Sequence, residues 1–89
     1  MNRVVYKYEL AGDAIRIPKG KVLLVAQQDH IEVPTVWVEH PLDNKGVLDW
    51  DNTMTLIKIA TGQQFQLWAH AHVGSCICGP YVWHIYGEL

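Results

Sequence analysis

Apolar and polar positions alternate along much of the chain and predict a series of short β-strands. In residues 3–10 every second side chain is apolar, which is the period of a strand with one apolar face. Further strands are predicted at residues 14–17, 21–28, 31–39, 53–60, 71–77 and 81–86. Since almost no segment has a helical period, we predict an all-β, mainly antiparallel fold, a compact sandwich or barrel of about six or seven short strands.

Three segments give this pattern more detail. Residues 22–26 are continuously apolar, which predicts a strand buried on both faces. Pro34 has no N–H to donate, so its strand is predicted to be an edge strand or to contain a bulge. Residues 63–73 fit either a strand or a short helical turn.

The longest polar stretch is residues 40–52, which is rich in Asp, Asn, Gly and Pro. This composition is typical of an exposed loop. Its apolar residues Val47, Leu48 and Trp50 are expected to anchor it. We therefore expect one small β domain over residues 1–89, with an exposed polar loop at about 40–52.

Composition and charge limit the classes of function. The 89 residues are 49% hydrophobic and 18% charged, which suits one small core and not the large scaffolds of multistep enzymes. Seven basic and nine acidic residues give a net charge of −2, whereas a nucleic-acid surface needs concentrated basic charge. We predict no nucleic-acid partner, and homo-oligomerisation because so small a core has marginal stability.

The start of the chain has neither the basic region nor the apolar run of a secretory signal. No apolar run approaches the length of a membrane span. We therefore expect no membrane partner and a cytoplasmic location.

Two histidines and two cysteines lie close together near the end of the chain. His70-x-His72 followed by Cys76-x-Cys78 supplies the imidazole and thiolate ligands that Zn²⁺ prefers, but the cysteine spacing is shorter than in most structural zinc sites. We predict two free thiols, with zinc as the weaker alternative and no cofactor. A cysteine nucleophile with His84 as base also needs a third group that orients the base. So short a chain has little room to bring three such groups together, and we predict no enzymatic activity.

Aromatic side chains are plentiful, with four Trp and four Tyr. A small domain cannot easily bury four tryptophans, so we expect one of them at a ligand rim or a protein interface. Aromatic faces beside basic side chains would also suit a nucleobase that carries a phosphate. The residues predicted to contact a ligand or partner are Arg16, Lys19, Trp50, Trp68, His70, His72 and His84.

Several short motifs occur in fixed order along nearly the whole chain. They are Tyr6-Lys7-Tyr8, Ile17-Pro18-Lys19-Gly20, the Trp37 strand, Thr61-Gly62, His72-Val73-Gly74 and Val82-Trp83-His84-Ile85-Tyr86. Together they resemble a family of short uncharacterised bacteriophage and prophage proteins without assigned activity. The resemblance implies a phage accessory protein that acts in the cytoplasm of the host.

These observations predict a non-catalytic binding protein that neutralises a host component. The leading form is an oligomeric sponge that sequesters a nucleotide-like immune signal in pockets between subunits. The alternatives are an inhibitor that covers the surface of a host defence protein and a structural or virion accessory protein. The near-neutral charge, without acidic runs that would imitate DNA, favours the sponge over the inhibitor.

Overall fold

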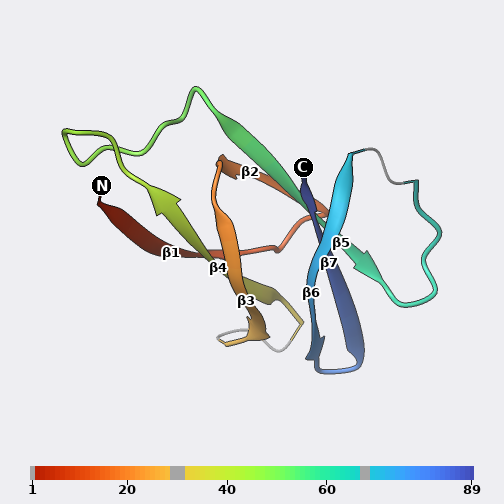
Figure 1. Ribbon diagram of the computed structural model, residues 1–89. Coiled ribbons are helices and arrows are strands. Elements are labelled where there is room, and N and C mark those ends of the chain that lie inside the picture. The colour runs from red at the N-terminus through yellow and green to blue at the C-terminus, as the bar shows by residue number, and fades with distance from the viewer. Residues whose placement is uncertain (1, 29–31, 67–68) are drawn as a thin grey trace.

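A computed structural model describes residues 2–28, 32–66 and 69–89, and these residues form seven β-strands. The strands are β1 (Arg3–Glu9), β2 (Ala14–Pro18), β3 (Lys21–Gln27), β4 (Pro34–Pro41), β5 (Thr53–Ala60), β6 (His70–Cys78) and β7 (Tyr81–Glu88). They form two antiparallel sheets, β1-β4-β3 (sheet A) and β2-β5-β7-β6 (sheet B), shown in Figure 1. The predicted all-β fold is confirmed, and the arrangement is consistent with a small sandwich. In the described part of the chain, no helix is long and apolar enough to cross a membrane.

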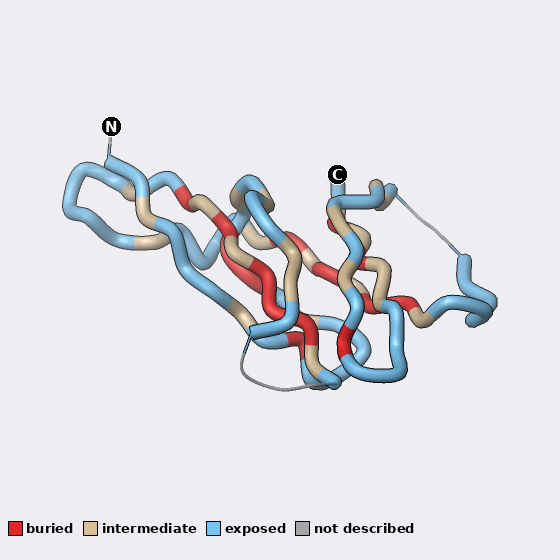
Figure 2. The backbone as a smooth tube through the Cα atoms, turned by 90° about the horizontal axis from the view of Figure 1, so that it is seen from below, coloured by how far each residue is buried: buried red, intermediate tan, exposed pale blue. Residues whose placement is uncertain are grey.

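The hydrophobic core lies where the two sheets face each other. Val36 and Val38 of β4 pack with Leu56 of β5 and Ile85 of β7, and all four side chains are fully buried. Burying such an aliphatic side chain contributes about 1.5 to 3 kcal/mol. In Figure 2 the buried stretches run through the middle of the molecule, and most of the connecting loops are exposed.

The two sheets approach each other closely where β3 meets β6. A Cβ added at Gly74 of β6 would lie 2.5 Å from Cγ2 of Val25 in β3, which is closer than two carbon atoms can pack. Glycine at this position therefore lets the two edge strands touch.

Two predictions for sheet A are wrong. Pro34 marks neither an edge strand nor a bulge, because β4 is the central strand and the irregularity in its pairing with β3 lies between Val22 and Leu24, away from Pro34. Pro34 is its first residue, a position where proline is tolerated. β3 is not buried on both faces, because it is an edge strand with an irregularity between Val22 and Leu24, and Leu24 is 54% exposed. A continuous apolar run does not reveal which strands cover its two faces.

The polar loop between β4 and β5 is mostly exposed, and two of its expected anchors are not buried. Leu48 is half-buried, whereas Val47 and Trp50 are 53% and 59% exposed. The loop is instead held by Asp43, whose carboxylate accepts hydrogen bonds from the backbone N–H groups of Lys45 and Val47. Local bonds of this kind let an aspartate form a turn without apolar anchors.

Candidate functional site

Four of the predicted site residues share the outer face of sheet B. Residues paired across an antiparallel sheet point to the same face. Arg16 of β2 pairs with Thr55 of β5, and His70 of β6 pairs with Glu88 of β7. The Thr55 N–H donates to the Glu88 carboxylate at 2.8 Å, which joins the two pairs into one row.

The next two rows bring His72 and His84 together on this face. His72 pairs with Tyr86, and His84 pairs with Ser75. The imidazole rings of His72 and His84 have their centroids 6.5 Å apart. Strict alternation along β6 would place positions 72 and 75 on opposite faces, yet Ser75 shares the face of the histidines.

A bulge in β6 explains this difference. The register shifts between His72 and Gly74, so that one extra residue, Val73, is inserted. An inserted residue reverses the facing of every later position in the strand. Ser75 therefore lies on the outer face with the histidines. Cys76 and Cys78, which follow it, lie on the inner face.

Four side chains on this face form a continuous chain of hydrogen bonds, which we call the histidine cluster: Thr61, His72, Ser75 and His84. The Ser75 Oγ lies 2.8 Å from His72 Nε2 and 2.8 Å from His84 Nδ1. The other nitrogen of His84, Nε2, lies 2.8 Å from the Thr61 Oγ1. Ser75 thus connects two imidazoles that come from neighbouring strands.

The donor and the acceptor of each of these hydrogen bonds follow from the carbonyl of Val82, which ends the chain of bonds and can only accept. The Thr61 hydroxyl donates to the Val82 carbonyl at 3.5 Å, so Thr61 accepts its other bond from His84 Nε2–H. A neutral imidazole has one donor and one acceptor nitrogen. His84 Nδ1 therefore accepts from the Ser75 hydroxyl, and Ser75 accepts from His72 Nε2–H. Every hydroxyl in the histidine cluster both donates and accepts.

Two aromatic rings stand beside the histidine cluster. The ring of Tyr86 meets the ring of His72 edge-on at 5.4 Å between centroids, and Phe65 lies 5.2 Å from Tyr86 on its other side. Phe65 is 43% exposed. A partly exposed aromatic ring therefore lies close to the hydrogen-bonded histidine cluster.

The two faces of β7 have different surroundings. Ile85 points into the core and is fully buried. His84 is half-buried and has polar partners on both sides, Ser75 and Thr61.

The remaining predicted residues lie apart from the histidine cluster. Arg16 is on the same face, but β5 and β7 separate β2 from β6, so it is about 14 Å away across the sheet. Its guanidinium donates to the hydroxyls of Thr53 and Thr55. Trp50 lies in the exposed loop before β5, and Trp68 is outside the described residues.

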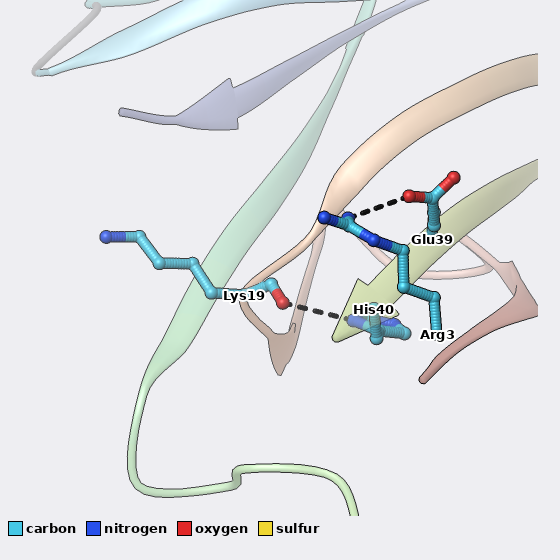
Figure 3. A network of polar contacts seen from close by, with 4 residues as sticks. All are labelled: Arg3, Lys19, Glu39 and His40. Carbon is cyan, nitrogen blue, oxygen red and sulfur yellow. Dashed lines mark hydrogen bonds and ion pairs between the residues drawn. The ribbon is translucent and has the colours of Figure 1, made fainter. Parts of the chain in front are cut away.

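Lys19 lies at the turn after β2, where its N–H donates to the Asn52 carbonyl at 2.9 Å. Its backbone carbonyl accepts a hydrogen bond from His40 Nδ1–H at 3.2 Å, while its side chain extends away from His40, as Figure 3 shows. On the neighbouring strands Arg3 and Glu39 form an ion pair at 2.8 Å. The structure thus gives the main chain of Lys19 a role in the turn.

The two cysteines lie on the inner face of sheet B, opposite the histidines. Cys76 pairs with Trp83, and its Sγ lies 3.4 Å from that of Cys78. The bulge therefore separates the cysteine pair from His70 and His72, which removes the geometric basis for a zinc site of two histidines and two cysteines. Within the described ranges, no group of three or more His, Cys, Asp or Glu residues converges on a metal position.

We expect the Cys76 thiol to be unreactive in the folded protein. Burial, and then the hydrogen bond to Cys78, raise the pKa of Cys76 from 9.0 to about 12. The thiolate is the reactive form, so iodoacetamide at about pH 8 should modify the native protein much more slowly than the unfolded chain. Mass spectrometry of the alkylated protein measures both rates.

The same pKa predicts how stability depends on pH. Between about pH 9 and pH 12 the unfolded chain loses the Cys76 proton and the folded protein keeps it. The contribution of this thiol to stability is therefore complete below pH 9 and falls as the pH rises through this window. Cys76→Ser removes the titration and is the control. An alkaline loss of stability that is unchanged in this variant would contradict the assignment.

One concave region lies elsewhere. A hollow of about 470 Å³ is lined by Asn2, Leu42, Asp43 and Asn44. Among its described lining residues there is one carboxylate and no cationic side chain, which does not suit an anionic ligand. The histidine cluster is therefore the better candidate site for such a ligand.

Sequence reasoning missed Thr61, Phe65, Ser75 and Tyr86 as parts of this site. A glycine inside a strand pattern indicates a bulge or a close backbone approach, and Gly74 was the available signal. Had the bulge been placed there, Ser75 would have been assigned to the face of His72.

Comparison with known proteins gives one family. The model of a family described as a domain of unknown function, DUF7352, matches residues 1–89. The chain therefore belongs to this family. No curated protein and no solved structure matches the chain.

Proposed function

We propose that this member of the DUF7352 family is a non-catalytic binding protein that holds an anionic, nucleotide-like small molecule on the outer face of sheet B. The observation that carries the proposal is the histidine cluster, in which Ser75 Oγ lies 2.8 Å from one nitrogen of His72 and 2.8 Å from one of His84. A phosphate bound here would take over donors that now act within the cluster, the Nε2–H of His72 and the hydroxyl of Ser75.

The neighbouring rings would hold the base of such a ligand. Tyr86 lies beside His72, and Phe65, which contacts Tyr86, is 43% exposed. Stacking of a base on an aromatic ring contributes about 1 to 3 kcal/mol and tolerates different bases. Arg16 on the same face adds positive charge at a distance. The face therefore has a polar part for the phosphate next to an aromatic part for the base.

In the biological form of the proposal, the protein is a homo-oligomer that neutralises a host component by binding it. The ligand would then be a nucleotide-type immune signal, in line with the resemblance to bacteriophage proteins. An inhibitor that covers a host defence protein would use an exposed aromatic patch and bind no small ligand tightly. A virion accessory protein would associate without limit or enter particles.

The first experiment measures bound ligand directly. The protein is purified without chelator from cells with an active nucleotide-signalling defence and from cells without it, and both samples are examined by native mass spectrometry. A discrete extra mass of nucleotide size in the first sample alone supports sequestration. Bare protein in both samples contradicts it and directs the search to a protein target.

The second experiment locates the site with purified fluorescent cyclic and linear nucleotides, and with inorganic phosphate as the minimal probe. His84→Gln and Phe65→Ala should each weaken nucleotide binding by about tenfold, because each removes one phosphate or stacking contact. Lys45→Ala, in the exposed loop, is the matched control and should bind as the unaltered protein does. If all variants bind equally, the ligand does not occupy this face.

Ser75 between two imidazoles also favours a second candidate function, hydrolysis by a base-activated serine. Such a serine needs an imidazole base that a further group orients, and Thr61 contacts the far nitrogen of His84. Turnover of an activated ester that is lost in Ser75→Ala would replace the binding proposal with this one. Unchanged background hydrolysis in both proteins would remove it.

A further inference from the structure

We propose that two copies of this chain pair antiparallel through β1, with Tyr6 on the twofold axis. The interface lies on sheet A and the histidine cluster on sheet B, so the inference deepens the oligomeric part of the proposed function without depending on the ligand. Sheet A of each copy has three strands, so the sheets A of the two copies would join into one sheet of six strands.

β1 differs from the other strands at the sheet edges. β2 is a short strand of five residues that ends in Pro18, and β3 and β6 each contain a bulge or irregularity. Short length, proline and bulges are the features that keep edge strands from pairing with other chains. β1 is seven residues long, contains no proline and pairs with β4 in unbroken register.

The hydrogen-bonding direction of β1 identifies which residues face the edge. The Asn2 carbonyl accepts from Leu42 N–H, and Leu10 N–H donates to the Pro34 carbonyl. Since this direction alternates along a strand, the backbone groups of even-numbered residues face β4. Those of Arg3, Val5, Lys7 and Glu9 face the outer edge, where Val5 is 48% exposed.

The sequence of β1 is complementary to itself in one register. With Tyr6 opposite Tyr6 of the second copy, Arg3 lies opposite Glu9, and Val5 lies opposite Lys7. Twofold symmetry repeats each pair, so two pairs of opposite charge flank the axis. In this register each edge-facing residue of one copy lies opposite an edge-facing residue of the other copy. Each such pair exchanges two backbone hydrogen bonds.

Neighbouring registers are less favourable. The register moves in steps of two residues, because only edge-facing residues can pair. A step in one direction places Val5 on the axis and sets Arg3 of one copy opposite Lys7 of the other. A step in the other direction places Lys7 on the axis, opposite Lys7 of the second copy. Like charges directly opposite each other destabilise strand pairing, so charge selects the register centred on Tyr6.

Lys7 and Glu9 each have a partner within their own chain; Lys7 donates to the Gln28 side chain at 2.7 Å, and Arg3 is paired with Glu39. A carboxylate accepts several hydrogen bonds and a guanidinium donates up to five. The contact across the axis can therefore add to these interactions without replacing them.

A charge-swap experiment tests the register. Sedimentation velocity over about 1 µM to about 1 mM should show a concentration-dependent dimer. Glu9→Arg and Arg3→Glu should each weaken it by about tenfold, since both set like charges opposite each other. A mixture of these two variants should recover the affinity as a heterodimer, because each Arg then meets a Glu. Glu9→Gln is the control for simple loss of charge and should have an intermediate affinity.

A cross-linking experiment tests the position of the axis. Tyr6→Cys places two thiols opposite each other at a pair without backbone hydrogen bonds, where strands approach most closely. Under mild oxidation it should form a disulfide-linked dimer faster than Val5→Cys does, because position 5 lies opposite Lys7 of the second copy and not opposite position 5. A monomer at all concentrations, or equal cross-linking of the two variants, overturns the proposal. Nucleotide binding by the weakened Glu9→Arg variant would show that the ligand site stands even if this interface does not.

Discussion

Gly20→Ala is expected to destabilise the protein by about 3 kcal/mol, because the new methyl group would collide with main chain. A Cβ at Gly20 would lie 2.5 Å from the Glu39 carbonyl oxygen and 2.7 Å from Nδ1 of His40. A carbonyl of the central strand β4 cannot rotate away as a side chain can. The turn after β2 would have to move off β4.

The movement would also break the buried hydrogen bonds of His40, which is fully buried. Its Nδ1–H donates to the Lys19 carbonyl, so its Nε2 accepts from the Tyr8 hydroxyl at 2.8 Å. Burial, and then the nearby Tyr6, raise the pKa of Tyr8, so this hydroxyl keeps its proton at neutral pH. Moving Lys19 would leave a buried N–H without its acceptor, which is costly.

Thermal unfolding followed by circular dichroism measures this effect. For a domain of this size, about 3 kcal/mol corresponds to a Tm lower by about 15 °C. Gly12→Ala is the matched control, because a Cβ at Gly12 has nothing within 4 Å, and its Tm should change by no more than about 2 °C. Equal Tm values for the two variants would mean that the turn shifts freely and that His40 does not hold it.

Local sequence patterns were sufficient to find the strands of this fold. The predicted strand at residues 53–60 has the bounds of β5, because a β-rich run there ends at a Thr-Gly turn. Gly79, which lies between the strands predicted at residues 71–77 and 81–86, has the positive φ of 60° that glycine adopts readily. Strand ends depend on turn residues and period, and both are visible in a single sequence.

The order of strands in the sheets depends on contacts distant in sequence, and these were not predictable. Pro34 was interpreted as an edge feature, yet β4 lies between β1 and β3. Nothing within residues 31–41 specifies which strands lie on either side. The same limit applies to β3, whose apolar run is compatible with an exposed face.

The candidate site was partly predictable for a related reason. The histidines at positions 72 and 84 could be selected by residue type, but their common partner depended on the bulge at Val73. A one-residue insertion reverses the facing of Ser75 relative to His72. Residue type indicated the chemistry, and only the strand register showed which groups meet.

Lys58→Ala is expected to destabilise the fold by about 3 kcal/mol, because it removes both a packed side chain and a buried donor. Lys58 of β5 is only 6% exposed, and its Nζ donates to the carbonyls of Leu10 at 2.8 Å and Ala11 at 3.3 Å. The ammonium also lies 4.3 Å from the centre of the Trp83 ring. Lys58 thus joins the connection between β1 and β2 to sheet B.

Lys58→Met separates these two contributions. Methionine keeps an apolar stem of similar length but donates no hydrogen bond, so the carbonyls of Leu10 and Ala11 lose their donor, and we expect a loss of about 2 kcal/mol. Lys21→Met, at an exposed position of β3, is the control and should change stability by no more than about 0.5 kcal/mol. Urea unfolding measures all three variants.

The difference in stability between the two Lys58 variants shows how the connection between β1 and β2 is held to sheet B. If Lys58→Met is as stable as the unaltered protein, packing of the stem is sufficient and the ammonium contributes nothing net, as apolar replacement of buried charges sometimes shows. If it loses about 2 kcal/mol, the carbonyls after β1 require a donor from sheet B. We expect the second result, because the Lys58 ammonium is buried and donates to two carbonyls. The backbone N–H of Lys58 also donates to the Asp13 carbonyl at 2.9 Å. Main chain and side chain of one residue then hold both ends of the connection from Leu10 to Asp13.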